Sequence, residues 1–217
     1  MAPARIGLRA FGLSAAAVVA VELALAEALG AGWLQPMAAL GGARAIEIFA
    51  LLGIFQRWGG GLDRIGLLWE SLLPGIVRGL WWSGGAGILA AAAFLLLFLF
   101  GIHPLTLMPI GLPREMPARV ALYVVGGGLG PVAEEIFFRG ILYGYLRRWG
   151  MVPAMLVSTA VFAMMHTAAG VTQVVGGILF AAAYEAEGSL AAPITIHVLG
   201  NLALFSLPVL LPLTGQW

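Results

Sequence analysis

Residues 118–148 read ARVALYVVGGGLGPVAEEIFFRGILYGYLRR, a stretch that is long and apolar enough to cross a membrane as a helix. Glu134, Glu135 and Arg139 lie inside this stretch. A charged group in the hydrocarbon of a bilayer costs about 2.5–3.5 kcal/mol on insertion scales, and such groups commonly serve a function. The stretch therefore predicts a membrane protein in which one transmembrane helix carries a functional site.

The composition of the whole chain also indicates a membrane protein. Of its 217 residues, 61% are hydrophobic and only 10% are charged, whereas soluble domains carry about 25% charged residues. No polar segment is long enough for a second domain. We therefore expect a single integral membrane domain over residues 1–217, with an all-α fold: a polytopic bundle of about seven transmembrane helices, within a range of six to eight.

Charge and residue usage exclude several classes of function. The net charge of +1 leaves no basic footprint for a nucleic acid. The absence of cysteine excludes disulfides, thiolate nucleophiles and thiolate metal sites. Asp63 is the sole aspartate, so a pair of catalytic aspartates is impossible. The chain also lacks the His-Glu-x-x-His motif of zinc proteases and the Gly-x-Ser-x-Gly motif of serine hydrolases.

Hydropathy predicts helical spans at 10–34, 43–58, 79–101, 118–148, 153–169, 171–186 and 190–213. Two of these, 153–169 and 171–186, are short and suit helices that are surrounded by other helices. The amphipathic segment 62–78 predicts an interfacial helix or a partial eighth span. With seven spans and the N-terminus inside, the inner side holds Arg5, Arg9, Arg57, Arg64, Arg78, Arg147 and Arg148, and the outer side Arg44, Arg114 and Arg119. The positive-inside rule therefore predicts a cytoplasmic N-terminus.

Spacing assigns different directions to the two acids of the central stretch. Glu135 and Arg139 are four residues apart, so they lie on one helix face and can pair. Glu134 points about 100° away and is free to face a cavity. Gly126–Gly130 and Pro131 precede the acids and predict either a kink or widened turn, or close helix packing through small residues. The two interpretations are compatible.

Two further pairs of residues repeat the spacing of four. Phe162 and His166 lie on the span 153–169, and His197 and Asn201 lie on the last span. Polar faces on three apolar helices favour one convergent site. A glutamate with imidazoles can activate water as a general base and then protonate a leaving amine. An amide such as Asn201 can stabilise an oxyanion, so this set suits peptide hydrolysis.

The three motifs together resemble those of a known family. Glu134-Glu135-x-x-x-Arg139, Phe162-x-x-x-His166 and His197-x-x-x-Asn201 are similar, in order, to the motifs of the CPBP family (CAAX protease and bacteriocin-processing, or ABI). These are intramembrane proteases, and the Ras-converting CAAX prenyl endopeptidase is one of them. The resemblance covers a catalytic core at about residues 118–205. It implies a hydrolase in the plasma (inner) membrane of a bacterium.

The resemblance also implies a role for each motif residue. Glu134 is the expected base that activates water, assisted by His166, while His197 and Asn201 form the side that stabilises the oxyanion. The expected supporting residues are Glu135 and Arg139, which hold Glu134 and its helix in place, and Phe162.

The sequence leaves alternatives open for the cofactor, the substrate and the activity. We expect a glutamic-type mechanism without a cofactor, and the alternative is zinc held by Glu134, His166 and His197. The expected partners are the lipid bilayer and a membrane-associated peptide or protein substrate, and no nucleic acid. One alternative function is a non-proteolytic membrane protein, such as a bacteriocin immunity or scaffold component. Another is a proton-coupled transporter that uses the acids and histidines as a relay.

Overall fold

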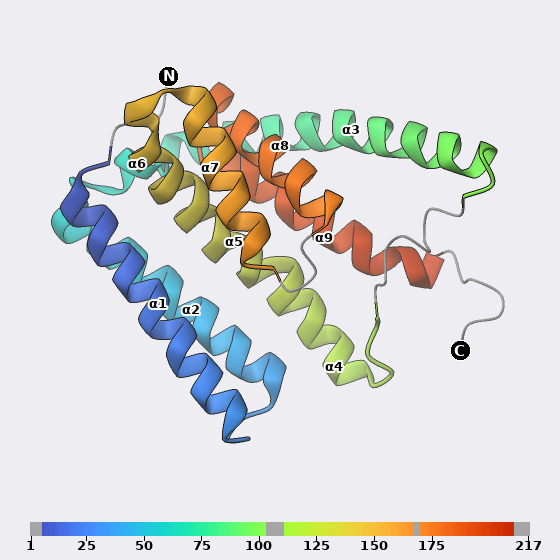
Figure 1. Ribbon diagram of the computed structural model, residues 1–217, viewed down its shortest axis with the longest axis horizontal. Helices are drawn as coiled ribbons and strands as arrows, with labels where there is room; N and C mark the ends of the chain where they lie inside the picture. The colour runs from blue at the N-terminus through green and yellow to red at the C-terminus, as the bar shows by residue number, and fades with distance from the viewer. Residues whose placement is uncertain (1–5, 103–110, 167–169, 211–217) are drawn as a thin grey trace.

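The computed structural model describes residues 6–102, 111–166 and 170–210, and no strand occurs among them. The predicted all-α polytopic bundle is confirmed. In the described part of the chain, five helical segments are long and apolar enough to cross a membrane: Leu8–Gly30, Pro36–Gly59, Leu62–Leu99, Met116–Trp149 and Ala191–Val209. Two shorter helices, α7 (Met151–Met164) and α8 (Val171–Glu187), come between the last two of these segments (Figure 1).

The first two helices form an antiparallel hairpin on one side of the bundle (Figure 1). They are α1 (Leu8–Gly30) and α2 (Pro36–Ile54), and a short π-helix, η1 (Phe55–Gly59), continues α2. Helix α2 begins at Pro36, before the predicted start of this span at residue 43, so Arg44 lies well inside the helix. Its guanidinium contacts the carboxylates of Glu22 on α1, at 2.5 Å, and of Glu47. These acids supply the countercharge that lets an arginine lie inside an apolar hairpin.

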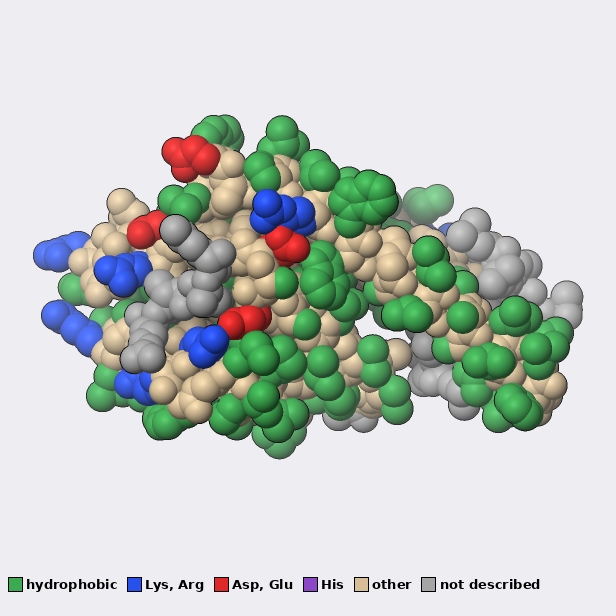
Figure 2. Space-filling model, turned by 90° about the horizontal axis from the view of Figure 1, so that it is seen from above, with side chains coloured by type: hydrophobic (Ala, Val, Ile, Leu, Met, Phe, Trp, Pro, Cys, Tyr) green, Lys and Arg blue, Asp and Glu red, His purple; other side chains and the backbone are tan. Residues whose placement is uncertain are grey.

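A single long helix replaces two predicted elements. The 3₁₀ turn η2 (Leu62–Ile65) is followed by α3 (Trp69–Leu99), so the predicted boundary between 62–78 and 79–101 is wrong. The side chains become less polar along α3, but the helix itself is continuous. The first half packs closely on α9, where a Cβ on Gly79 would lie 2.8 Å from a backbone oxygen of that helix. The second half diverges from the bundle (Figure 1), and Figure 2 shows hydrophobic side chains covering this end of the molecule.

The segment that carries the acids is a continuous helix with two widened parts. Two π-helical stretches, η4 (Leu122–Leu129) and η5 (Ile136–Tyr143), flank α5 (Gly130–Glu135). Helix α4 (Met116–Ala121) precedes them, and α6 (Gly144–Leu146) and the 3₁₀ turn η6 (Arg147–Trp149) follow. The predicted widened turn is confirmed. Close packing is also found, because a Cβ on Gly127 would lie 2.7 Å from Leu202 of α9.

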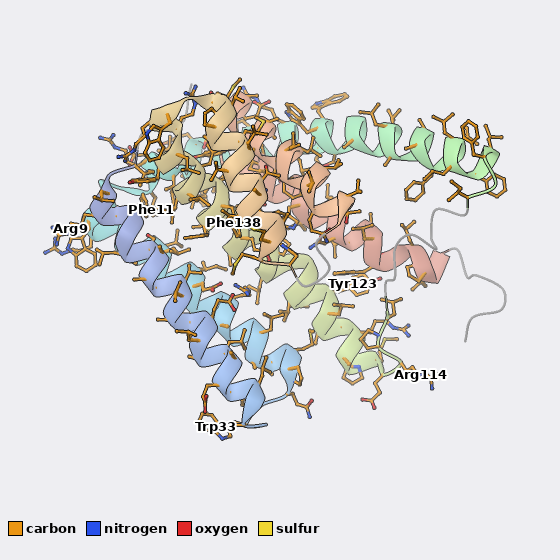
Figure 3. All side chains as sticks on the ribbon, viewed as in Figure 1. Arg9, Phe11, Trp33, Arg114, Tyr123 and Phe138 are labelled. Carbon is orange, nitrogen blue, oxygen red and sulfur yellow. The ribbon has the colours of Figure 1, made fainter. Side chains whose placement is uncertain are left out.

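Helices α7, α8 and α9 (Ala191–Leu210) pack against one another and complete the bundle. Helix α7 ends at Met164, earlier than the predicted end at residue 169, and residues 167–169 lie outside the described part of the chain. His166 therefore follows the helix instead of lying on it. The core surrounds the segment 116–149, where Phe138 packs with Phe162 and Phe180, and Figure 3 shows Phe138 among the crossing helices.

Candidate active site

The structure brings Glu134 together with both histidines of the motifs. Oε2 of Glu134, on α5, lies 3.8 Å from Nε2 of His166 and 3.8 Å from Nε2 of His197 on α9. This oxygen is buried and has no hydrogen-bond partner among the described residues. The Glu134 side chain is nevertheless 21% exposed and that of His166 is 30% exposed, so the cluster is accessible from one side.

The second acid binds a different set of residues. Oε1 of Glu135 accepts a hydrogen bond of 3.0 Å from Nη1 of Arg139, as the spacing of four predicts. The same oxygen accepts a hydrogen bond of 2.8 Å from Nδ1 of His197, 62 residues later in the chain. Glu135 and Arg139 are both fully buried. Glu135 thus supports His197 directly, a contact that the sequence analysis missed.

Aromatic rings surround the buried guanidinium of Arg139. Its central carbon lies 4.5 Å from the ring centroid of Phe162 and 5.1 Å from that of Phe180, distances at which a cation is attracted to the face of a ring. Nη2 donates to the backbone carbonyl of Gly177 at 3.3 Å. Phe180 also stacks on His197, with ring centroids 4.5 Å apart. Phe162 and Phe180 therefore hold the charged pair and the imidazole in one dry cluster.

The partners of the two imidazoles fix which ring nitrogen carries the proton. Nδ1 of His166 lies 2.8 Å from the carbonyl oxygen of Phe162, in the last turn of α7, where carbonyls lack backbone partners. A carbonyl only accepts, so Nδ1 donates, and Oε1 of Glu135, which also accepts from Arg139, imposes the same choice on His197. In their neutral forms both rings therefore present the lone pair of Nε2 toward Glu134. Three hydrogen-bond acceptors converge, an arrangement suited to holding the protons of a water molecule.

Asn201 binds a backbone carbonyl that the widened helix leaves without a partner. The N–H of Gly130 bonds to the carbonyl of Val125, five residues earlier. In that register the carbonyl of Gly126 would pair with residue 131, which is a proline and has no N–H. Nδ2 of Asn201 donates to this carbonyl at 2.9 Å. The second hydrogen of the amide remains available to another acceptor.

The chemistry of the donor set can be compared with the needs of a metal ion. Two imidazole nitrogens and a carboxylate are ligand types that zinc accepts. Within residues 6–102, 111–166 and 170–210, however, no three His, Cys, Asp or Glu side chains are placed to hold one ion together. We therefore derive no step through a metal at Glu134, His166 and His197.

Comparison with known proteins gives one family. Residues 116–203 match the model of the family described as type II CAAX prenyl endopeptidase Rce1-like. All three motifs lie within this range, so the family resemblance seen in the sequence is confirmed. The match and the apolar helices support a membrane-embedded endopeptidase of the CAAX type. No curated protein and no solved structure matches the chain significantly.

Proposed function

Because the chain carries an Rce1-like domain over residues 116–203, we propose that it hydrolyses a peptide bond of a membrane-associated protein or peptide through a water activated by Glu134 and His166. The observation that carries this proposal is the position of Glu134. Its buried Oε2 has no partner among the described residues and lies 3.8 Å from Nε2 of both His166 and His197. A water there would have a base for one proton and an imidazole for the other.

The reaction begins when Glu134 takes a proton from this water and the water oxygen bonds to the carbonyl carbon of the substrate. The π electrons of the carbonyl move to its oxygen, which becomes an oxyanion. When the intermediate collapses, the C–N bond breaks and Glu134 returns the proton to the leaving amine. General acid–base help of this kind contributes about 10²–10⁴-fold.

His197 and Asn201 serve the oxyanion in this scheme. Glu135 holds His197 through Nδ1, and in the protonated form of the ring Nε2–H can donate to the oxyanion. The second amide hydrogen of Asn201 offers another donor. Donors that are held in place before the charge develops lower the barrier. Removing one such donor lowers kcat by about 10²–10³-fold.

The cleavage is tested by quantitative proteomics of membranes from cells lacking the gene and complemented with wild type, Glu134→Gln or Glu115→Gln. Glu115 is an exposed acid at the start of α4 and provides the matched control. We expect a membrane-associated precursor to accumulate uncleaved in the deletion strain and with Glu134→Gln, and to be processed with wild type and Glu115→Gln. Normal processing by both Glu134→Gln and His166→Ala would exclude the proposed mechanism.

The proposed mechanism needs no cofactor, and zinc is its alternative. Cleavage by the purified protein is expected to persist after treatment with a strong zinc chelator, and elemental analysis is expected to find zinc far below one ion per chain. Loss of activity on chelation, with recovery on adding zinc, would favour the metal-dependent alternative instead.

We place the protein in the inner membrane of a bacterium with a cytoplasmic N-terminus. Arg9 and Arg114 lie at opposite ends of the molecule in Figure 3. Arg148 binds the backbone of Ile6 at 2.6 Å, so it shares the end that holds Arg9. The native chain has no cysteine. A membrane-impermeant thiol reagent applied to intact spheroplasts is therefore expected to label Arg114→Cys and not Arg9→Cys, and the reverse pattern would overturn this orientation.

A further inference from the structure

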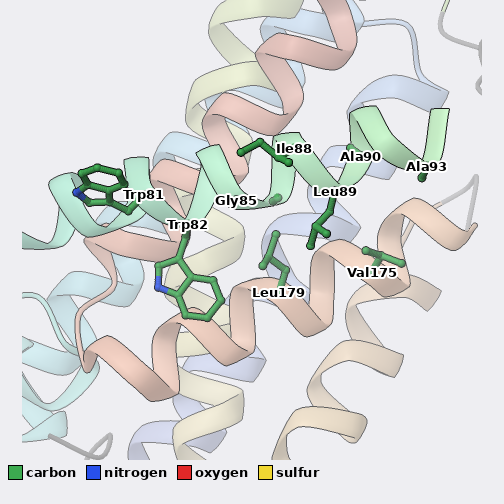
Figure 4. Close-up of a pocket in the computed structure, with 10 residues that line it drawn as sticks. Trp81, Trp82, Gly85, Ile88, Leu89, Ala90, Ala93, Val175 and Leu179 are labelled. Carbon is green, nitrogen blue, oxygen red and sulfur yellow. The ribbon is translucent and has the colours of Figure 1, made fainter. Parts of the chain in front are cut away.

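An apolar groove lies between α3 and α8, outside the cluster around Glu134. Its volume is about 840 Å³, and Figure 4 shows the side chains that line it. Trp82, Gly85 and Leu89 of α3 form one wall, and Val175 and Leu179 of α8 form the other. Among the lining residues, the polar side-chain groups are the indole N–H groups of Trp81 and Trp82. The indole N–H of Trp82 donates to Glu187 at 3.1 Å, so its hydrogen is already bound.

The two ends of the groove differ in polarity. At one end, Arg78 donates to Glu187 at 2.8 Å, and its side chain is 57% exposed, so further guanidinium donors face outward. Trp81 beside it is 79% exposed. Exposed arginine and tryptophan mark the interface between a membrane and water. Toward the other end, Ile88 and Leu89 are exposed and apolar, as suits contact with hydrocarbon.

The length of the groove and its apolar lining indicate which class of ligand it can bind. From Trp82 to Ala93, both of which line the groove, the helix rises about 16 Å. One leaflet of a bilayer contains about 15 Å of hydrocarbon, half of a core of about 30 Å. A peptide in the groove would leave its backbone amides without partners, which costs several kcal/mol for each group. A hydrocarbon chain makes no such demand.

We infer that this groove binds an acyl chain of a membrane phospholipid, with the headgroup phosphate at Arg78. The apolar chain would run from the interface at Trp81 toward Ala93, and the guanidinium of Arg78 would donate to the phosphate in a charge-assisted hydrogen bond. This site is separate from the proposed catalytic cluster, and the inference does not depend on proteolysis.

Two neighbouring glycines provide a matched pair of variants. A Cβ on Gly85 would meet nothing within 4 Å, so Gly85→Leu projects into the groove without displacing other atoms. A Cβ on Gly84 also meets nothing within 4 Å, but Gly84 does not line the groove. Gly84→Leu therefore reproduces the change in helix propensity and added bulk on α3 while leaving the groove open.

The experiment measures the phospholipid that stays bound to the delipidated full-length protein after exposure to vesicles of phosphatidylglycerol and phosphatidylethanolamine, using native mass spectrometry. Gly85→Leu is expected to lower bound phospholipid by at least about tenfold, through the loss of apolar contact, and Gly84→Leu is expected to retain it. Arg78→Gln is expected to weaken the preference for phosphatidylglycerol. Equal retention in both glycine variants would overturn the inference.

A second measurement adds no side-chain bulk to the groove. Phospholipids with brominated acyl chains quench nearby tryptophan fluorescence, so the native protein is expected to lose part of its quenching in Trp82→Phe. Quenching that is the same in wild type and Trp82→Phe would count against the groove. Impaired peptide cleavage by Gly85→Leu, with phospholipid fully retained, would assign the groove to the substrate and would also overturn the inference.

Discussion

Nδ1 of His197 donates to Oε1 of Glu135 across 2.8 Å and thereby joins α9 to α5 inside the bundle. The same oxygen binds Arg139, and neither Glu135 nor Arg139 is exposed. Two adjacent acids therefore have different environments: Glu135 is fixed through Oε1 by two partners, although its Oε2 has none, whereas Glu134 has an unpartnered Oε2 and lies 3.8 Å from two imidazoles in the described part of the chain. This difference yields different predictions for protein stability when glutamate is replaced by glutamine at positions 134 and 135.

Glu135→Gln is expected to destabilise the protein and to inactivate it. The substitution leaves the guanidinium of Arg139 buried without an anion, and breaking a buried pair costs about 3–5 kcal/mol. It also weakens the contact that holds His197 in place for the oxyanion, so activity should fall by about 10²-fold or more. Thermal unfolding in detergent and cleavage of a peptide substrate measure the two effects, with Glu115→Gln as the control. An unfolding temperature equal to that of wild type would contradict this account of the pair.

Glu134→Gln is expected to abolish cleavage without lowering the unfolding temperature. The substitution replaces a buried carboxylate oxygen that lacks a partner among the described residues, so folding loses no hydrogen bond and is relieved of a charge. Catalytic groups commonly trade stability for function in this way. The same unfolding and cleavage assays apply. A loss of stability as large as that of Glu135→Gln would show that Glu134 is a structural residue.

The sequence was sufficient to predict directions along one helix. The spacing of four correctly pairs Glu135 with Arg139, and the rotation of about 100° per residue correctly turns Glu134 away from them. The contact between Glu135 and His197 could not be predicted, because it depends on how α9 is rotated against α5. Hydropathy also placed the start of the second span at residue 43, although α2 begins at Pro36, since it reports the average polarity of a segment and does not detect that nearby acids neutralise the charge of Arg44.

Other residues of the cluster carried no signal in the sequence. Phe180 and Gly177 contact Arg139 from an apolar helix, where one more phenylalanine or glycine is unremarkable. The bond between Asn201 and Gly126 follows from the π-helical register before Pro131, and a widened turn was predicted there. Its exact register, which decides which carbonyl loses its partner, depends on packing against α9.

Asn201→Ala is expected to lower both stability and activity, through separate contacts. Loss of its bond leaves the half-buried carbonyl of Gly126 unsatisfied, at a cost of up to about 1–3 kcal/mol. Loss of an oxyanion donor lowers kcat by about 10²–10³ with little change in KM. The second substitution Pro131→Ala restores a backbone N–H that can reach Gly126. The double variant should therefore regain stability and keep a low kcat. Recovery of kcat would show that Asn201 only connects the two helices and does not act on the oxyanion.

Arg44→Met is expected to destabilise the α1–α2 hairpin by about 3–5 kcal/mol, because it leaves Glu47, only 3% exposed, without its cation. Replacing Glu22 and Glu47 by glutamine as well removes all three charges, and such a change is commonly neutral or stabilising. The triple variant should therefore unfold at or above the temperature of wild type. Arg114→Met, at an exposed arginine, is the matched control for thermal unfolding in detergent.

If Arg44→Met unfolds like this control, the ion cluster does not stabilise the hairpin. If the triple variant is as unstable as Arg44→Met, the loss comes from the packing of the arginine side chain and not from an uncompensated charge.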